Sequence, residues 1–154
     1  MIKRIPIFIF IAFLLTVFNV SSEDIKINII SDKLHVDMDE RKSTFTGNVH
    51  AYNKNLKIWS EKMVVNLKLK KDEIKEIIAS GNVKILRLVE GGEIYGDHAN
   101  YSLENEIIVI TGKVIVKENG NQVSGNELMV DLKNSSSIMM GSDSNRVEAL
   151  IIDN

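Results

Sequence analysis

A pattern of small, polar and apolar residues recurs four times along this chain, and this repeat limits its possible folds more than any other feature. Each copy is anchored on a small residue: Ser31, Ser60, Gly96 and Gly125, which are 29, 36 and 29 residues apart. The third, fifth and seventh positions after each anchor are apolar. A unit that returns at such intervals is typical of one supersecondary element stacked on copies of itself.

The alternation in each copy predicts a β-strand with one buried face, because successive side chains of a strand point to opposite sides. A further apolar residue precedes each anchor by two positions, as Ile58 does in the second copy. Met63 follows the anchor by three positions and therefore lies an odd number of positions after Ile58. In a regular strand the two side chains would point to opposite faces, that is, they have opposite parity. Something near the anchor must therefore switch the buried side, and a β-bulge or a sheet corner does so.

A glycine inside a second strand forms the other half of the repeat. Its copies are Gly47, Gly81 and Gly112, with a degenerate fourth at Gly141, in steps of 34, 31 and 29 residues. Here the alternation continues through the glycine, so that Ala79 and Val83 share one face. A glycine at such a place permits a sharp bend, or it leaves room for another backbone or a guest molecule.

Polar breaks between the apolar runs favour antiparallel hairpins over alternating strands and helices. Residues 68–78 also suit a helix, but the repeat favours a turn followed by a strand. We therefore expect an all-β, single-domain fold of about a dozen or more short antiparallel strands. Two sheets would face each other across one aliphatic interior.

The equivalent apolar positions of the repeat predict which side chains line this interior. They are Leu34, Val36, Phe45, Met63, Val65, Val83, Ile85, Tyr101, Val114, Val116, Leu128 and Val130. Such a face is either an ordinary packed core or a core that opens to admit alkyl chains. Composition does not separate these two interpretations, since both require apolar side chains.

Residues 1–22 have the pattern of a secretory signal peptide. Lys3 and Arg4 form a positive start, residues 5–18 are an almost continuous apolar run, and small residues precede position 23. We expect cleavage after Ser22 and an exported, mature domain of residues 23–154. The alternative is a retained membrane anchor, for which the apolar run is short.

Charge and composition exclude several classes of function. Removing Lys3 and Arg4 changes the formal net charge from −2 to −4, which does not favour nucleic-acid binding. The chain has no cysteine, which excludes a disulfide framework and a thiolate metal site. The lysines from Lys54 to Lys71 are interspersed with the acid Glu61 and followed directly by Asp72 and Glu73, which is typical of a solvated face.

No catalytic constellation is evident. The histidines His35, His50 and His98 occupy unlike places in the repeat, and His35 and His98 fall at outward-facing positions. Paired carboxylates such as Asp72 and Glu73 are the groups that glycoside hydrolysis needs. They belong to turns without aromatic sugar platforms beside them. We therefore expect no enzymatic activity, no metal site and no cofactor.

Four segments, in order behind the apolar N-terminus, carry a family resemblance. They are residues 30–34 (ISDKL), 45–49 (FTGNV), 79–83 (ASGNV) and 96–99 (GDHA). Over about residues 24–150 the chain resembles the OstA-like domain of the LptA family of periplasmic lipopolysaccharide-transport proteins. The resemblance implies an antiparallel β-jellyroll, often called a β-taco, whose aliphatic interior holds the lipid A acyl chains of lipopolysaccharide. It implies a periplasmic location, and neither catalysis nor a cofactor.

The resemblance also implies partners. These are an LptC-like component at the inner membrane, an LptD-like component at the outer membrane, and further copies of the chain joined head to tail. The chain departs from the family in charge, because many members carry basic tails or patches and this one is mildly acidic. The alternatives are a membrane-anchored LptC-like component of the same pathway, or a structural β-repeat protein that binds only other proteins.

Both ends of the expected domain are apolar strands without caps. Residues 25–30 alternate in polarity, and residues 147–152 form an apolar strand near the C-terminus. Unpaired strand edges attract further strands, and solenoids usually block them with polar or helical caps. Because the two ends differ, we expect heterologous, head-to-tail association.

Overall fold

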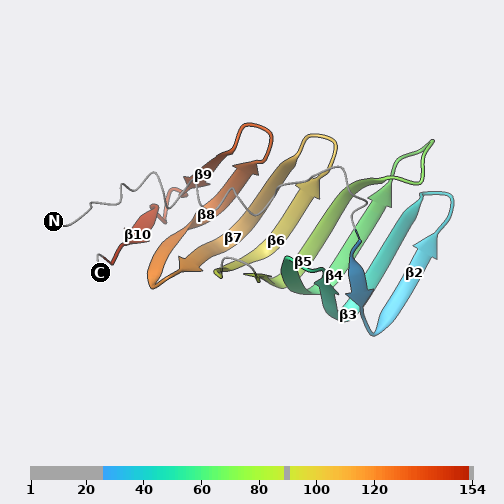
Figure 1. Cartoon of the computed structure of the whole chain (residues 1–154), viewed down its shortest axis with the longest axis horizontal. Helices are drawn as coiled ribbons and strands as arrows, with labels where there is room; N and C mark the ends of the chain where they lie inside the picture. The colour runs from blue at the N-terminus through green and yellow to red at the C-terminus, as the bar shows by residue number, and fades with distance from the viewer. Residues whose placement is uncertain (1–25, 89–90, 153–154) are drawn as a thin grey trace.

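In the computed structural model, residues 26–88 and 91–152 are described, and every regular element among them is a β-strand (Figure 1). All ten strands belong to one antiparallel sheet in the order β1-β3-β4-β5-β6-β7-β8-β10; β2 also pairs with β3, and β9 also pairs with β8. The strands are β1 (Asn28–Ile30), β2 (Lys33–Asp37), β3 (Lys42–Tyr52), β4 (Leu56–Leu67), β5 (Ile74–Arg87), β6 (Glu93–Ser102), β7 (Ile107–Glu118), β8 (Asn121–Asp131), β9 (Ser136–Met140) and β10 (Glu148–Leu150).

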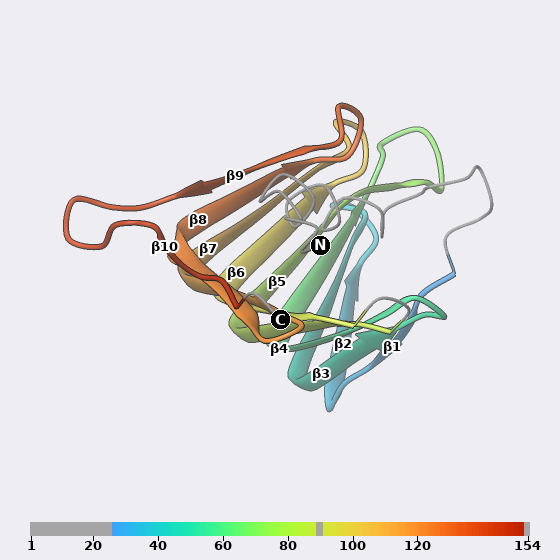
Figure 2. The same cartoon turned by 60° about the vertical axis from the view of Figure 1, so that its left-hand side comes forward.

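The sheet is folded into a V, and the long strands β3 to β8 run through both of its arms (Figure 2). We call the arm that includes β2 and β9 the upper arm, and the arm that includes β1 and β10 the lower arm. Phe45 faces Met63 in the upper arm, and Ala51 faces Ile58 in the lower arm. The pairing register shifts between Thr46 and Val49 where β3 meets β4. It shifts at the equivalent place in each following strand pair up to β7 and β8. The bulge predicted from the change of parity is therefore confirmed.

The repeated glycines form the bends at these bulges. Gly81 and Asn82 have positive φ angles of 80° and 47°, and the other two complete copies show the same pair of values within a few degrees. A Cβ atom on Gly81 would lie 2.5 Å from Oε2 of Glu61, whose Oε1 accepts a hydrogen bond from Asn82 Nδ2 at 2.6 Å. The carboxylate thus occupies the space beside the glycine, which supports the bend interpretation rather than room for a guest.

The core lies between the two arms. One row of facing side chains crosses the upper arm from Phe45 to Met139, and it includes Met63 opposite Ala79. A second row crosses the lower arm and includes Ile85 opposite Ile94. The inner residues of both arms join in a single hydrophobic cluster.

Three details of the expected fold were wrong. The described strands number ten rather than a dozen or more, and they are longer than expected, up to the 14 residues of β5. They form one folded sheet rather than two facing sheets. The reason is that each strand continues through its bulge, so the ladder between neighbours resumes in the second arm. The segment 68–78 is a turn followed by β5, as the repeat predicted.

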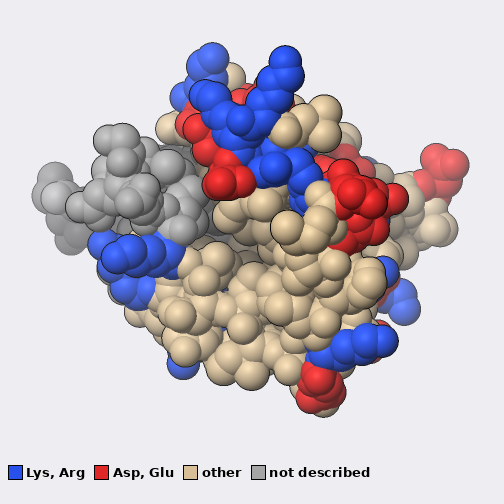
Figure 3. Space-filling view, turned by 90° about the vertical axis from the view of Figure 1, so that its right-hand side faces the viewer, with Lys and Arg blue, Asp and Glu red and all other residues tan. Residues whose placement is uncertain are grey.

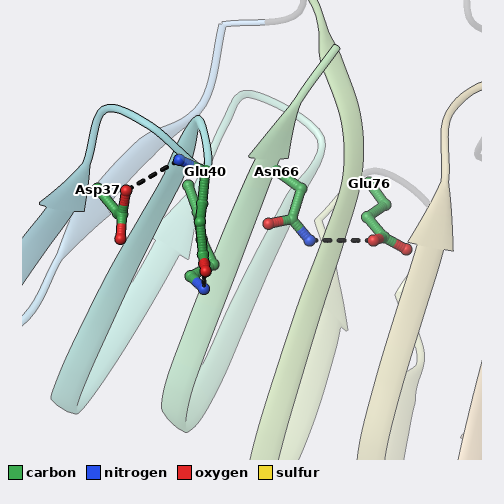
Figure 4. A network of polar contacts seen from close by, with 5 residues as sticks. Asp37, Glu40, Asn66 and Glu76 are labelled. Carbon is green, nitrogen blue, oxygen red and sulfur yellow. Dashed lines mark hydrogen bonds and ion pairs between the residues drawn. The ribbon is translucent and has the colours of Figure 1, made fainter. Parts of the chain in front are cut away.

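Local contacts hold the turns at the upper ends of the strands (Figure 4). Asp37 Oδ1 accepts a hydrogen bond from the backbone N–H of Glu40 at 2.9 Å, which lowers the pKa of the Asp37 carboxyl. Between neighbouring strands, Asn66 Nδ2 donates to Glu76 Oε1 at 3.0 Å. These are structural contacts of the kind that close hairpins.

Candidate functional site

The inner face of the V is the most extensive apolar surface that the described residues form. Fourteen hydrophobic side chains on it are at most 9% exposed. All are aliphatic, and the rings of Phe45 and Tyr101 pack against them from the margin. Burial raises the pKa of the Tyr101 hydroxyl. The chemistry of this face suits hydrocarbon.

Most of the twelve residues predicted to line the interior lie on this face. Seven are buried: Met63, Val83, Ile85, Val114, Val116, Leu128 and Val130. Three are partly buried: Phe45, Val65 and Tyr101. The remaining two are Leu34, which is 53% exposed, and Val36, which is 48% exposed.

The exposure of Leu34 and Val36 follows from their place in the sheet. Leu34 is opposite Phe45 in the register, so both side chains belong to the inner face. β2 is nevertheless a terminal strand, and in the described sheet it has a neighbour on one side only. At this end of the molecule the surface is largely uncharged at its centre, with charged side chains gathered around it (Figure 3). The inner face therefore reaches solvent at the β2 end.

Along the middle of the sheet the inner side chains fill the space between the arms. Met63 and Val114 have no exposed surface, and Val49 is 1% exposed. A guest molecule would have to part the arms there or enter from the open end. A separate shallow hollow of about 390 Å³ lies near Glu93, Lys117 and Leu150. Its mixed polar lining does not match a hydrocarbon chain.

One charged pair interrupts the apolar inner face, and the sequence analysis missed it. Arg87 Nη2 donates to Glu118 Oε1 at 2.6 Å, and the two residues are only 2% and 3% exposed. Parity provides a signal, because Arg87 follows Ile85 by two positions and Glu118 follows Val116 by two. The pair is positioned across β6, at the lower margin of the inner face.

Other predicted polar positions remain on the surface. His35 and His98 are exposed, as expected from parity. His50 stacks on Trp59 with 4.9 Å between the ring centres. Within residues 26–88 and 91–152 there is no group of three or more His, Asp or Glu side chains placed to hold a metal ion. The same residues contain no helix that could span a membrane.

Comparisons with known proteins agree with this architecture. Residues 28–136 match the family described as LptA/(LptD N-terminal domain) LPS transport protein. An uncharacterized protein of Rickettsia prowazekii (strain Madrid E), RP507, is 22% identical over 129 residues, covering 82% of this chain and 89% of the relative. The crystal structure of LptH from Pseudomonas aeruginosa superposes with a TM-score of 0.71 at 13% identity, covering 82% of this chain and 95% of LptH. LptH is described as the LptA-homologous periplasmic component of the lipopolysaccharide transport device.

Fold and inner face together define an open, antiparallel β-jellyroll with an aliphatic interior. Because the family match covers most of the chain, the protein belongs to the LptA/(LptD N-terminal domain) family of lipopolysaccharide transport proteins. The family and the fold are those of transport proteins.

Proposed function

We propose that this protein is a periplasmic bridge component that carries lipopolysaccharide from the inner to the outer membrane, with the acyl chains of lipid A held between the arms of the V. The observation that carries this proposal is the aliphatic inner face, which continues from strand to strand and opens at Leu34 and Val36. The twelve predicted inner residues are the proposed lipid contacts. The conduit is passive, and the energy for direction comes from elsewhere.

The energetics favour a guest that stays between the arms. Each methylene buried from water contributes roughly 0.8 kcal/mol, so an acyl chain that leaves the interior loses several kcal/mol. In the closed structure the inner side chains already bury one another. Lipid binding therefore exchanges protein–protein contacts for protein–lipid contacts, which keeps loading and release reversible.

Transfer between copies requires their inner faces to join, and the repeat supplies a specific register. Each glycine-containing strand pairs with the next anchor strand, as Ile110 does with Leu128. Met139 in β9 occupies the position of Ile110, and Leu34 in β2 occupies the position of Leu128. Continuing the repeat places Met139 of one copy opposite Leu34 of the next.

The lower arm continues in the same way. Ile85 is opposite Ile94, and the equivalent residues at the two ends of the sheet are Ala149 in β10 and Ile29 in β1. Both ends present exposed apolar side chains, with Ile30 and Leu150 each 57% exposed. Such a contact is heterologous, so it extends into a filament. The LptC-like and LptD-like components would meet the two ends of that filament.

Native mass spectrometry of the purified protein tests lipid binding. We expect a bound species with the mass of lipopolysaccharide or its lipid A part. Protein that is lipid-free when recovered from lipopolysaccharide-containing membranes, and that stays lipid-free on incubation with lipopolysaccharide, would contradict the proposal. It would support a structural β-repeat protein instead.

Cysteine cross-linking tests the register, since the chain has no cysteine of its own. We expect a Met139→Cys copy and a Leu34→Cys copy to form a mixed disulfide dimer, because facing Cβ atoms of antiparallel strands are about 4.5–5.5 Å apart. The matched control is Met139→Cys with Val36→Cys, two residues out of register. Efficient cross-linking of the control pair, or of neither pair, would refute the register.

The mature N-terminus distinguishes the bridge from the alternative within the same pathway. Residues 1–25 lie outside the described residues, so cleavage after Ser22 remains a prediction. A mature chain that starts near Glu23 would support the exported bridge component. An intact N-terminus in the membrane fraction would support an LptC-like anchored component.

A further inference from the structure

The outer face of the lower arm carries a continuous stack of rings and lysines. The register aligns His50, Trp59, Lys84 and Tyr95 on four adjacent strands, β3 to β6. Their inner-face neighbours are the buried residues of the core, so these side chains point away from it. The proposed lipid function leaves this surface unused.

Within the stack each group covers the next. The rings of His50 and Trp59 are parallel within 5° and 4.9 Å apart. Lys84 Nζ lies 5.8 Å from the Trp59 ring centre and 5.5 Å from the Tyr95 ring centre. Lys117 Nζ lies 5.6 Å from Tyr95. The ring faces are therefore occupied by neighbours, and the Tyr95 hydroxyl donates a hydrogen bond to Glu93 Oε2 at 2.7 Å.

This arrangement argues against a free sugar as the ligand. Sugars stack on exposed ring faces, and here those faces already contact another ring or an ammonium group. Amphipathic rings that present their polar edges are instead typical of the interface between a membrane and water.

The surface is positive although the protein is acidic. In the part of this face formed by the described residues of β3 to β7, Lys57, Lys84 and Lys117 accompany one acid, Glu93, a formal surplus of two positive charges. Glu148 lies further along the same face, on β10. Glu93 is neutralised locally, since it accepts a hydrogen bond from Tyr95 at 2.7 Å and pairs with Lys84 at 3.0 Å. The whole chain has a formal charge of −2. The complementary partner is therefore an anionic surface.

We propose that this outer face, defined by Tyr52, Trp59, Lys57, Lys84, Tyr95 and Lys117, docks on the surface of a bilayer that contains anionic phospholipids. Lysines near an anionic membrane attract it electrostatically, and the rings insert at the level of the head groups. Docking holds the V against the membrane by its outer face and leaves the inner face and both strand ends accessible. The site is separate from the proposed lipid groove.

Trp59 is the only tryptophan of the chain, and it lies in the proposed surface, so its fluorescence reports docking directly. The exported protein, with its N-terminus defined by mass spectrometry, is titrated with vesicles of equal parts phosphatidylglycerol and phosphatidylcholine. We expect a blue shift of the Trp59 emission and co-sedimentation with the vesicles. Both should weaken at high salt and be absent with pure phosphatidylcholine.

Single substitutions test whether vesicle binding depends on this outer face. Lys84→Gln and Lys117→Gln should each lower the vesicle partition coefficient about fivefold. Lys62→Gln, on the outer face of the upper arm, is the matched control and should change it little. Val65→Asp, on the inner face, should retain vesicle binding, so that failure of the lipid groove and failure of docking can be told apart.

Four results would overturn the proposal. The first is the absence of binding to anionic vesicles. The second is equal binding to neutral vesicles. The third is equal weakening of vesicle binding by Lys62→Gln and Lys84→Gln. The fourth is a Trp59 shift caused by a soluble phosphorylated sugar but not by vesicles, which would assign the surface to a free anion instead.

Discussion

The bend of the sheet depends on the glycine at each corner, and Gly81→Ala tests this dependence. Alanine at a φ of +80° costs about 1–2 kcal/mol, because its Cβ crowds the following carbonyl. The added Cβ would also lie 2.8 Å from Cβ of Glu61, an atom that the backbone holds in place. Overpacking of this kind costs about 1–3 kcal/mol. We expect Gly81→Ala to lower the free energy of unfolding by about 2–5 kcal/mol, the sum of these two terms.

Gly91→Ala is the matched control, because it isolates the backbone contribution. Gly91 has a φ of +71°, and a Cβ there would have no neighbour within 4 Å. We expect it to cost only the conformational part, about 1–2 kcal/mol. Chemical denaturation followed by circular dichroism measures both variants. Equal losses for Gly81→Ala and Gly91→Ala would refute the view that the Glu61 carboxylate requires a glycine at the corner.

Three further predictions concern the groove, the strand ends and acid stability. Val65→Asp should abolish lipid co-purification at some cost in stability, whereas Val64→Asp on the opposite face of β4 should retain lipid; equal retention would show that the inner face is not the binding site. Deleting residues 147–154, which include β10, should leave a folded monomer that still binds lipid. If the truncated protein still forms concentration-dependent oligomers in sedimentation experiments, the end-strand contact is contradicted. Hydrogen bonds lower the pKa of Asp131, chiefly from Asn134, and that of Asp37, chiefly from the Glu40 backbone, below the usual 3.8. The two ionised carboxylates therefore stabilise the folded state above pH 3.8, and this stabilisation is lost as the pH falls through their lower folded-state pKa values. Asp131→Asn removes one of them, so the melting temperature of this variant should decline less than that of the unmodified protein between about pH 5 and pH 2.

Period-two alternation was sufficient to predict an antiparallel all-β fold, the bulges and most of the inner face, but not the number and length of the strands. Met63, Val114 and Leu128 were assigned to the interior from parity alone, and all three are buried. Parity is a local property, since each side chain points to the side opposite its neighbour's. The change of parity between Ile58 and Met63 therefore located the bulge without any knowledge of the partner strand.

Parity does not show which strands pair or where the sheet ends, and the remaining features depend on both. The exposure of Leu34 follows from the terminal position of β2, and a single strand's sequence does not show whether another strand lies beside it. The Arg87–Glu118 pair joins β5 and β7, and the stack from His50 to Tyr95 joins four strands. These contacts arise from cross-strand register, which brings together residues far apart in sequence. Parity indicates that Arg87 and Glu118 face inward, but only the tertiary structure brings them together as an ion pair and aligns the charged, aromatic outer face.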